Sequence, residues 1–102
     1  MKKIIIGMLL ATVLSFSWDG VVTGTIGKMS IADGNNYDLR LNINGATDIC
    51  NGNDWAYLNH SDDNYKTYLS VLLTAKATKQ TVSVFTTGNS AGYCHIGYLV
   101  LD

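Results

Sequence analysis

The segment 61–87 restricts the fold more than any other part of the chain. Ser61 can cap a helix with its hydroxyl, and Asp62 and Asp63 put carboxylates in the first turn, where the helix dipole favours them. The apolar side chains that follow at helical spacing are Tyr65, Tyr68, Leu69, Leu72 and Leu73, with the stem of Lys76 extending their face. Residues 81–87 then alternate with the two-residue period of a strand. The sequence predicts one amphipathic helix that runs directly into a strand.

The other expected elements are all β-strands. A long first strand over 21–32 contains Gly24 and Gly27, and glycine inside a strand often marks a bulge or a sharp bend. A turn at 33–36 leads into a strictly alternating second strand. The expected strands are 21–32, 37–44, 55–58, 81–87 and a last one from 93 or 94 to 101, with the helix between the third and fourth.

This order, β-β-β-α-β-β, is that of an OB-fold, a five-stranded barrel whose helix closes one end. A strongly bent first strand can contribute to both halves of a small closed barrel, whereas five short strands in a flat sheet cannot bury both faces. A β-sandwich would need about seven strands, and a ferredoxin-like fold would need a second helix. We therefore predict a mainly β, OB-fold-like domain over residues 18–102.

Residues 1–17 have the pattern of a secretory signal peptide. Two lysines precede an apolar run over 4–14, and small residues precede a cleavage site after Ser17. The apolar run is shorter than the roughly 20 residues of a bilayer span, although a membrane anchor and a buried strand are the alternatives. We expect a bacterial protein, secreted or periplasmic, with no stable membrane insertion after cleavage.

The charge of the mature chain argues against nucleic acid as a partner. Its five cations are Lys28, Arg40, Lys66, Lys76 and Lys79; against eight aspartates they leave a net charge of −3. Proteins that bind a phosphate backbone do so through a basic stripe. We expect no nucleic acid binding.

The two cysteines, Cys50 and Cys94, predict a disulfide. An even pair in an exported chain is most simply oxidised, and a cross-link would help a domain this small. A metal site formed with His60 and His95 is the alternative, but the spacing matches no zinc pattern. We expect no metal and no other cofactor.

Sequence motifs for catalysis are missing. The chain contains no glutamate, and most of its aspartates occupy turns or the helix start. It has no nucleophile elbow, phosphate-binding loop or zinc-protease helix, and no nucleophile neighbours either histidine in sequence. We expect a non-enzymatic protein with no catalytic residues, and a small hydrolase is the least supported alternative.

Aromatic side chains are the main candidates for a binding site. Amphipathic rings among Asn, Ser and Thr residues suit a surface that stacks on sugars and hydrogen-bonds their hydroxyls, or a protein interface. Tyr37, Tyr57 and Tyr93 lie near loop ends and are the expected exposed, ligand-binding residues. Four other rings fall on periodic apolar faces and are expected in the core: Trp55, Tyr65, Phe85 and Tyr98.

The run from Ile49-Cys50 through Trp55 to the helix and on to Gln80-Thr-Val-Ser-Val-Phe85 resembles the B subunits of AB-type bacterial toxins, most nearly the subtilase-cytotoxin and pertussis-like branch. In those subunits a cysteine and a tryptophan precede a helix that runs directly into a strand. The resemblance covers 25–87 as a pattern of elements. It implies a pentameric ring of identical subunits that binds host glycans and partners a toxin A subunit. The single disulfide and short C-terminal part depart from the branch, so no pocket residue is carried over.

Other interpretations stay open. The chain also resembles small exported OB-like proteins without a toxin partner, which implies a monomeric periplasmic protein with a structural or ligand-binding role. An exposed aromatic and polar pocket at a loop end would favour glycan binding, and a large apolar patch along the helix or an edge strand would favour assembly. A histidine or aspartate in a cleft beside a nucleophile would favour the hydrolase.

Overall fold

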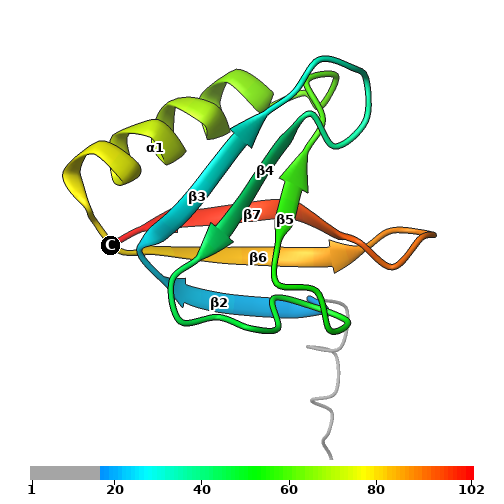
Figure 1. The fold of residues 1–102 in the computed structure, drawn as a ribbon, viewed down its shortest axis with the longest axis horizontal. Coiled ribbons are helices and arrows are strands. Elements are labelled where there is room, and N and C mark those ends of the chain that lie inside the picture. The colour runs from blue at the N-terminus through cyan, green and yellow to red at the C-terminus, as the bar shows by residue number, and fades with distance from the viewer. Residues whose placement is uncertain (1–16) are drawn as a thin grey trace, which may run out of the picture.

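The computed structural model describes residues 17–102, so the expected signal peptide lies almost entirely outside the described residues. Six strands and one helix make up the described part (Figure 1). In chain order they are β2 (Gly20–Gly24), β3 (Ile26–Ile31), β4 (Leu39–Ile43), β5 (Ala56–Leu58), α1 (Tyr65–Thr78), β6 (Val82–Gly88) and β7 (Cys94–Leu101). Between residues 17 and 102 no helix is long and apolar enough to cross a membrane.

The strands form one sheet in the order β2-β6-β7-β5-β4-β3. Neighbouring strands are antiparallel except β5 and β7, which are parallel. The two edge strands, β2 and β3, are separated in sequence by Thr25 alone, so the chain passes from one edge to the other within a single residue. The sheet is therefore strongly curled, and Figure 1 shows β3, β4 and β5 running at a steep angle to β2, β6 and β7.

The mainly β fold with one helix is confirmed, but the closed five-stranded barrel is not what the structure shows. The expected first strand is divided at Thr25, which gives six strands in the order β-β-β-β-α-β-β. The loop before β5 lies beside β2, where hydrogen bonds between two strands would otherwise close the barrel. The Asn44 N–H donates to the Thr25 carbonyl at 2.9 Å, and a Cβ atom built on Gly20 would overlap the Ile49 carbonyl oxygen. The sheet is curled but open.

The helix begins later than predicted. Ser61 does not cap it; α1 starts at Tyr65, and its N-cap residue Asn64 makes no side-chain capping bond. The reason is a tight turn just before the helix, in which the Asp62 N–H donates to the Asn59 carbonyl and the Asp62 carboxylate accepts the Asn59 N–H at 2.9 Å. Asp62 therefore serves this turn instead of the first turn of α1.

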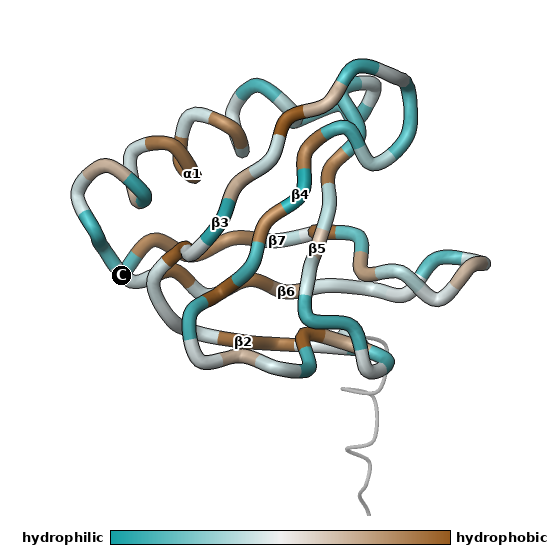
Figure 2. The backbone as a smooth tube through the Cα atoms, in the orientation of Figure 1, coloured by the Kyte–Doolittle hydropathy of each residue, from teal (hydrophilic) through white to brown (hydrophobic). Residues whose placement is uncertain are grey.

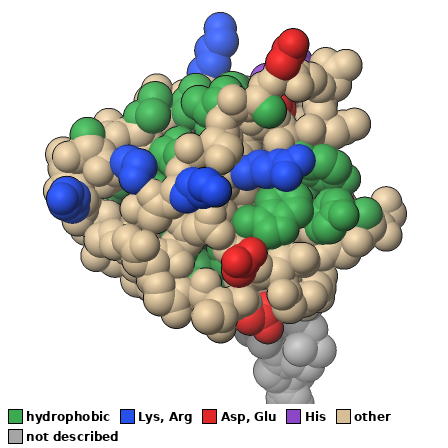
Figure 3. Space-filling model, in the orientation of Figure 1, with side chains coloured by type: hydrophobic (Ala, Val, Ile, Leu, Met, Phe, Trp, Pro, Cys, Tyr) green, Lys and Arg blue, Asp and Glu red, His purple; other side chains and the backbone are tan. Residues whose placement is uncertain are grey.

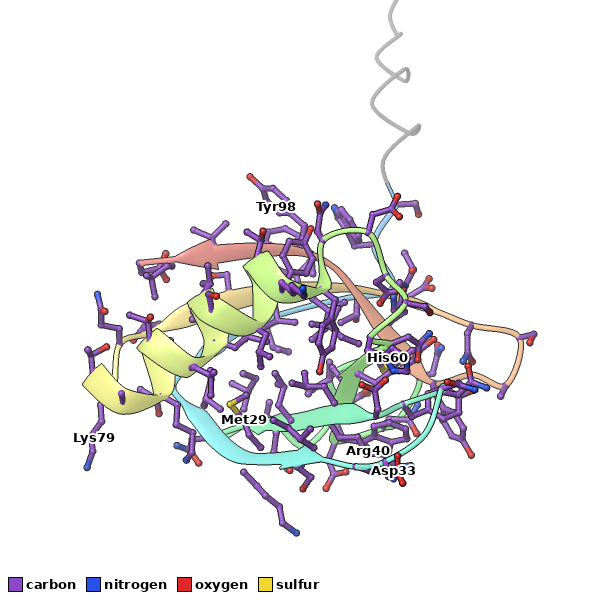
Figure 4. The ribbon with its side chains drawn as sticks, turned by 90° about the horizontal axis from the view of Figure 1, so that it is seen from above. Met29, Asp33, Arg40, His60, Lys79 and Tyr98 are labelled. Atoms are coloured by element: carbon purple, nitrogen blue, oxygen red, sulfur yellow. A yellow bond between two sulfur atoms is a disulfide. The ribbon has the colours of Figure 1, made fainter. Side chains whose placement is uncertain are left out.

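The junction between α1 and β6 is as predicted. Lys79 ends the helix in the left-handed conformation, with φ of 59°, and its N–H donates to the Ala75 carbonyl. Of the residues of α1, Leu72 and Ala75 are buried, whereas Leu73, expected on the same face, is exposed. Figure 4 shows the helix lying across one side of the curled sheet.

The core lies inside the curl of the sheet. The alternation predicted for β4 holds, because Leu39, Leu41 and Ile43 are buried while Arg40 is exposed. Figure 2 shows hydrophobic residues alternating with hydrophilic ones along this strand. The other large buried apolar side chains are Ile26, Ile49, Leu58, Leu72, Val82, Val84 and Ile96.

The predicted disulfide between Cys50 and Cys94 is present. Both residues are buried, and their Cα atoms are 5.9 Å apart. The bond joins the loop before β5 to the first residue of β7. Since β5 and β7 pair directly, with Ala56 opposite Cys94, the cross-link clamps the start of this parallel pair.

Candidate binding site

Four aromatic rings gather at the end of the sheet where β5 and β7 begin. The ring centroid of Tyr37 lies 4.6 Å from that of Tyr57 and 5.4 Å from that of Tyr93, and Trp55 lies 5.0 Å from Tyr93. We term Tyr37, Trp55, Tyr57 and Tyr93 the aromatic platform. Figure 3 shows a group of hydrophobic side chains at this end of the molecule, beside a long basic side chain.

Local backbone geometry places Tyr37 in the platform. Tyr37 has φ of 59°, a left-handed conformation that residues other than glycine seldom adopt. Its N–H donates to the Asn59 side-chain carbonyl at 2.7 Å, and its carbonyl accepts the Arg40 Nε–H at 3.1 Å. These backbone bonds stabilise the turn into β4, and the Tyr37 ring stands perpendicular to that of Tyr57.

Asn89, in the loop between β6 and β7, is the polar centre of the platform. Its side-chain oxygen accepts the N–H groups of Ala91 and Tyr93, both at 2.9 Å. A backbone N–H can only donate, so the amide nitrogen must face the other way, where it bonds the hydroxyls of Tyr37 and Tyr57 at 3.0 Å each. Both hydroxyls are acceptors here, and each keeps its own hydrogen for a further partner.

Arg40 adds a positive charge at the rim. Its guanidinium carbon lies 5.0 Å from the centre of the Trp55 ring, a cation–π arrangement that fixes both side chains. Arg40 is exposed and, within residues 17–102, forms no salt bridge. The guanidinium hydrogens that face solvent are thus available to a ligand.

The structure brings together the three tyrosines that were expected to bind a ligand, but not all on the surface. Tyr37 and Tyr93 are half-buried, whereas Tyr57 is only 4 % exposed, so the expectation that it is exposed was wrong. Tyr57 is the floor of the platform. Trp55 was assigned to the core, yet it is half-buried among the platform rings. Its position two residues before Tyr57, on the same side of a strand, could have revealed this.

A second aromatic cluster lies on the outer face of β6 and β7. Trp18 packs near Phe85 and Tyr98, with ring centroids 5.6 and 6.4 Å apart, and its ring covers Gly97. Phe85 and Tyr98 were expected in the core, but Phe85 is half-buried and Tyr98 is 51 % exposed. Figure 4 shows Tyr98 pointing away from the sheet. Together with exposed Val21, opposite Phe85 on β2, these rings form an apolar patch.

Two histidine–aspartate pairs flank the turn before α1. His95 Nε2 lies 2.8 Å from the Asp62 carboxylate, and His60 Nδ1 lies 3.4 Å from that of buried Asp38. In the described part of the chain, neither histidine hydrogen-bonds a serine, threonine or cysteine. Over the same residues no three His, Cys or Asp side chains gather where they could hold a metal ion. The pairs connect the turn to the start of β4 and to β7, and neither pair is positioned to activate a nucleophile.

Tyr57 makes the stability of the domain sensitive to alkali. Burial raises the pKa of Tyr57, and the hydrogen bond from Asn89 offsets this only in part. An unfolded tyrosine ionises near pH 10, so the folded state holds this proton to higher pH than the unfolded state does. The resulting stabilisation is complete below about pH 10 and is lost as pH rises further.

We expect the urea midpoint to fall above about pH 10, and to fall less steeply in Tyr57→Phe. The pKa of Tyr65 is also raised, by burial and by the nearby charge of Asp38. Because Tyr65 is present in both proteins, it adds the same loss of stability at high pH to each. Denaturation curves at several pH values test this. The prediction would be contradicted if the urea midpoint fell equally steeply with pH in the two proteins.

Comparison with known proteins supplies no relative of this site. No family model matches the chain, no curated protein matches its sequence and no solved structure matches its fold. Function is therefore inferred from the geometry of the platform and its surroundings.

Proposed function

We propose that the protein is an exported, non-enzymatic glycan-binding module and that the aromatic platform is its site. The observation that carries this proposal is the convergence of Tyr37, Trp55 and Tyr93 at one end of the sheet, around the Asn89 amide. Sugars present apolar C–H faces and polar edges. Partly exposed rings bordered by fixed hydrogen-bonding groups match both features.

The polar groups of the platform act mainly as donors. The bond from Asn89 leaves the Tyr37 hydroxyl with a free hydrogen, and Arg40 supplies further hydrogens at the rim. Such a site binds sugar oxygens that accept hydrogen bonds, including ring oxygens, carbonyls and carboxylates. Since the rings are held by one another and by the disulfide-linked loops, little ordering is needed on binding.

Assembly into a ring is the second part of the proposal. The resemblance to toxin B subunits implies it, and the apolar patch of Trp18, Val21, Phe85 and Tyr98 reaches the edge strand β2, where a second copy would cover it. We further propose that the curled sheet is an open relative of the OB barrel. The mass of the oxidised chain by light scattering at micromolar concentration tests the ring. A pentamer would support it, and a monomer would exclude it and leave the monomeric module.

Trp55→Ala tests the platform. We first expect at least one glycan on an array to bind the oxidised protein. We then expect the variant to bind that glycan about tenfold more weakly by calorimetry, because it loses one stacking face. Leu73→Ala is the control, since it removes an exposed apolar side chain on α1 that belongs to neither the platform nor the apolar patch. The proposal fails if no glycan binds or if both variants retain full affinity.

A further inference from the structure

Four of the five cations in residues 17–102 share one face of the molecule. Lys28 lies on β3, Arg40 on β4, and Lys76 and Lys79 at the C-terminal end of α1, all exposed. Figure 3 shows Lys and Arg side chains in a row across this face, ending beside the platform, with acidic side chains above and below the row but none within it. We term these four residues the basic row.

The row begins at a hollow beside the edge strand β3. Thr25, Gly27, Asn44, Lys76 and Lys79 line this hollow together with Ile26, so it contains two ammonium groups and no carboxylate. Lys76 Nζ donates to the Gly27 carbonyl at 2.5 Å, and an ammonium has two further hydrogens to offer. The hollow is suited to an anionic group.

None of the row's cations is neutralised by a neighbour. The salt bridges within the described residues involve only His60 and His95, so the lysines and Arg40 keep their full charge toward solvent. The helix dipole favours Lys76 and Lys79 at the end of α1, and a lysine on an edge strand such as Lys28 hinders strand pairing. These local reasons do not account for a continuous row that leads to the platform.

We infer that the basic row extends the platform into a site for an acidic polysaccharide. Carboxylates or sulfates along the chain would contact the row while one sugar occupies the platform. This inference rests on the proposed glycan binding. Single-stranded nucleic acid, the other polyanion, needs successive ring faces for successive bases, whereas the four rings here form a single cluster at one end of the row.

Dextran sulfate and uncharged dextran, which share one backbone, are the probes. We expect the protein to bind dextran sulfate at least tenfold more tightly than dextran, with an affinity that falls as sodium chloride is raised. Lys28→Glu and Lys79→Glu should each weaken dextran sulfate binding about tenfold. Lys66→Glu is the matched control, because it makes the same charge change on α1 outside the row, and it should weaken binding less than twofold.

Several outcomes would overturn the inference. Equal losses in all three variants would indicate a response to net charge alone. Full competition by inorganic sulfate at the same concentration of sulfate groups would indicate a site for one small anion, and tighter binding of oligothymidylate would indicate nucleic acid. Urea midpoints show whether each variant is folded. Because Lys28→Glu and Lys79→Glu should give the same loss of binding, a loss in only one of them would contradict a continuous row.

The same variants separate this inference from the proposed function. An array-identified neutral glycan should bind Lys28→Glu normally and Trp55→Ala weakly. If neutral glycans fail to bind while dextran sulfate still depends on Lys28 and Lys79, the platform proposal fails, and the row binds acidic chains by itself instead of extending the platform. If a neutral glycan binds but dextran sulfate does not, the row is refuted and the platform remains.

Discussion

Reduction of the Cys50–Cys94 disulfide should lower the free energy of unfolding by about 4 kcal/mol. The bond closes a loop across a sequence separation of 44, and opening that loop returns conformational entropy to the unfolded chain. Urea denaturation of the oxidised protein, and of the same protein kept in reductant, measures the difference. The reduced form retains the same buried side chains, so no cavity term enters the comparison. A loss below about 1 kcal/mol would contradict the prediction.

Reduction should also weaken the site before it unfolds the domain. Asn53, three residues after Cys50, donates its amide to the Gly92 carbonyl at 2.7 Å, inside the loop that carries Asn89 and Tyr93. The disulfide and this bond together hold the loop before β5 against the loop before β7. Glycan affinity should therefore fall on reduction under conditions where circular dichroism still shows the folded sheet. Unchanged affinity in the folded, reduced protein would show that the disulfide does not position the platform.

The features that were predictable from sequence are those fixed by near neighbours. The alternation of residues 39–43 and the junction from α1 into β6 depend on side chains only a few positions apart, and both are present. The disulfide was predictable for another reason. With only two cysteines there is one possible intrachain pairing, so no geometry was needed to assign it.

The details that were mispredicted depend on contacts between distant segments. The predicted helix start failed because the Asp62 carboxylate accepts the Asn59 N–H and also bonds His95 on β7. The predicted barrel failed to close because the loop before β5 occupies the space beside β2, with the Ile49 carbonyl against Gly20. Local sequence propensity predicts neither the helix start nor the open sheet, because each depends on contacts with segments that are distant in sequence.

The geometry of the candidate site was predictable only in outline. The three loop-end tyrosines do lie together, but the sequence does not show that Tyr57 is the floor, or that Asn89 bonds two rings from segments 52 and 32 residues away. The basic row was missed for a different reason. A net charge of −3 gives the balance of charges and not their positions, whereas the folded chain brings Lys76 and Lys79 to one hollow beside β3 and leaves Arg40 exposed on neighbouring β4.

Gly20→Ala should destabilise the protein by about 3 kcal/mol, the upper end of the range for overpacking. A methyl group at this position would overlap the Ile49 carbonyl oxygen and lie 2.9 Å from the Cys50 Cβ atom. Backbone cannot swing aside as a side chain can. β2 would have to separate from the loop that closes the curl, and the strain would reach the disulfide. The urea midpoint and the fitted free energy of unfolding measure the effect.

Gly88→Ala is the matched control, because Gly88 lies on β6, the strand that pairs with β2. A methyl group there would approach two side chains and no backbone, the Asn51 amide nitrogen at 2.5 Å and the Asp19 carboxylate at 3.4 Å. Exposed Asn51 can turn away at the cost of one long hydrogen bond, from its amide to the Gly92 carbonyl at 3.4 Å. We expect a loss below about 1 kcal/mol for this variant. If Gly20→Ala were tolerated as well as Gly88→Ala, the loop before β5 would not be pressed against β2. The open edge of the sheet would then need another explanation than the backbone contact between Gly20 and Ile49.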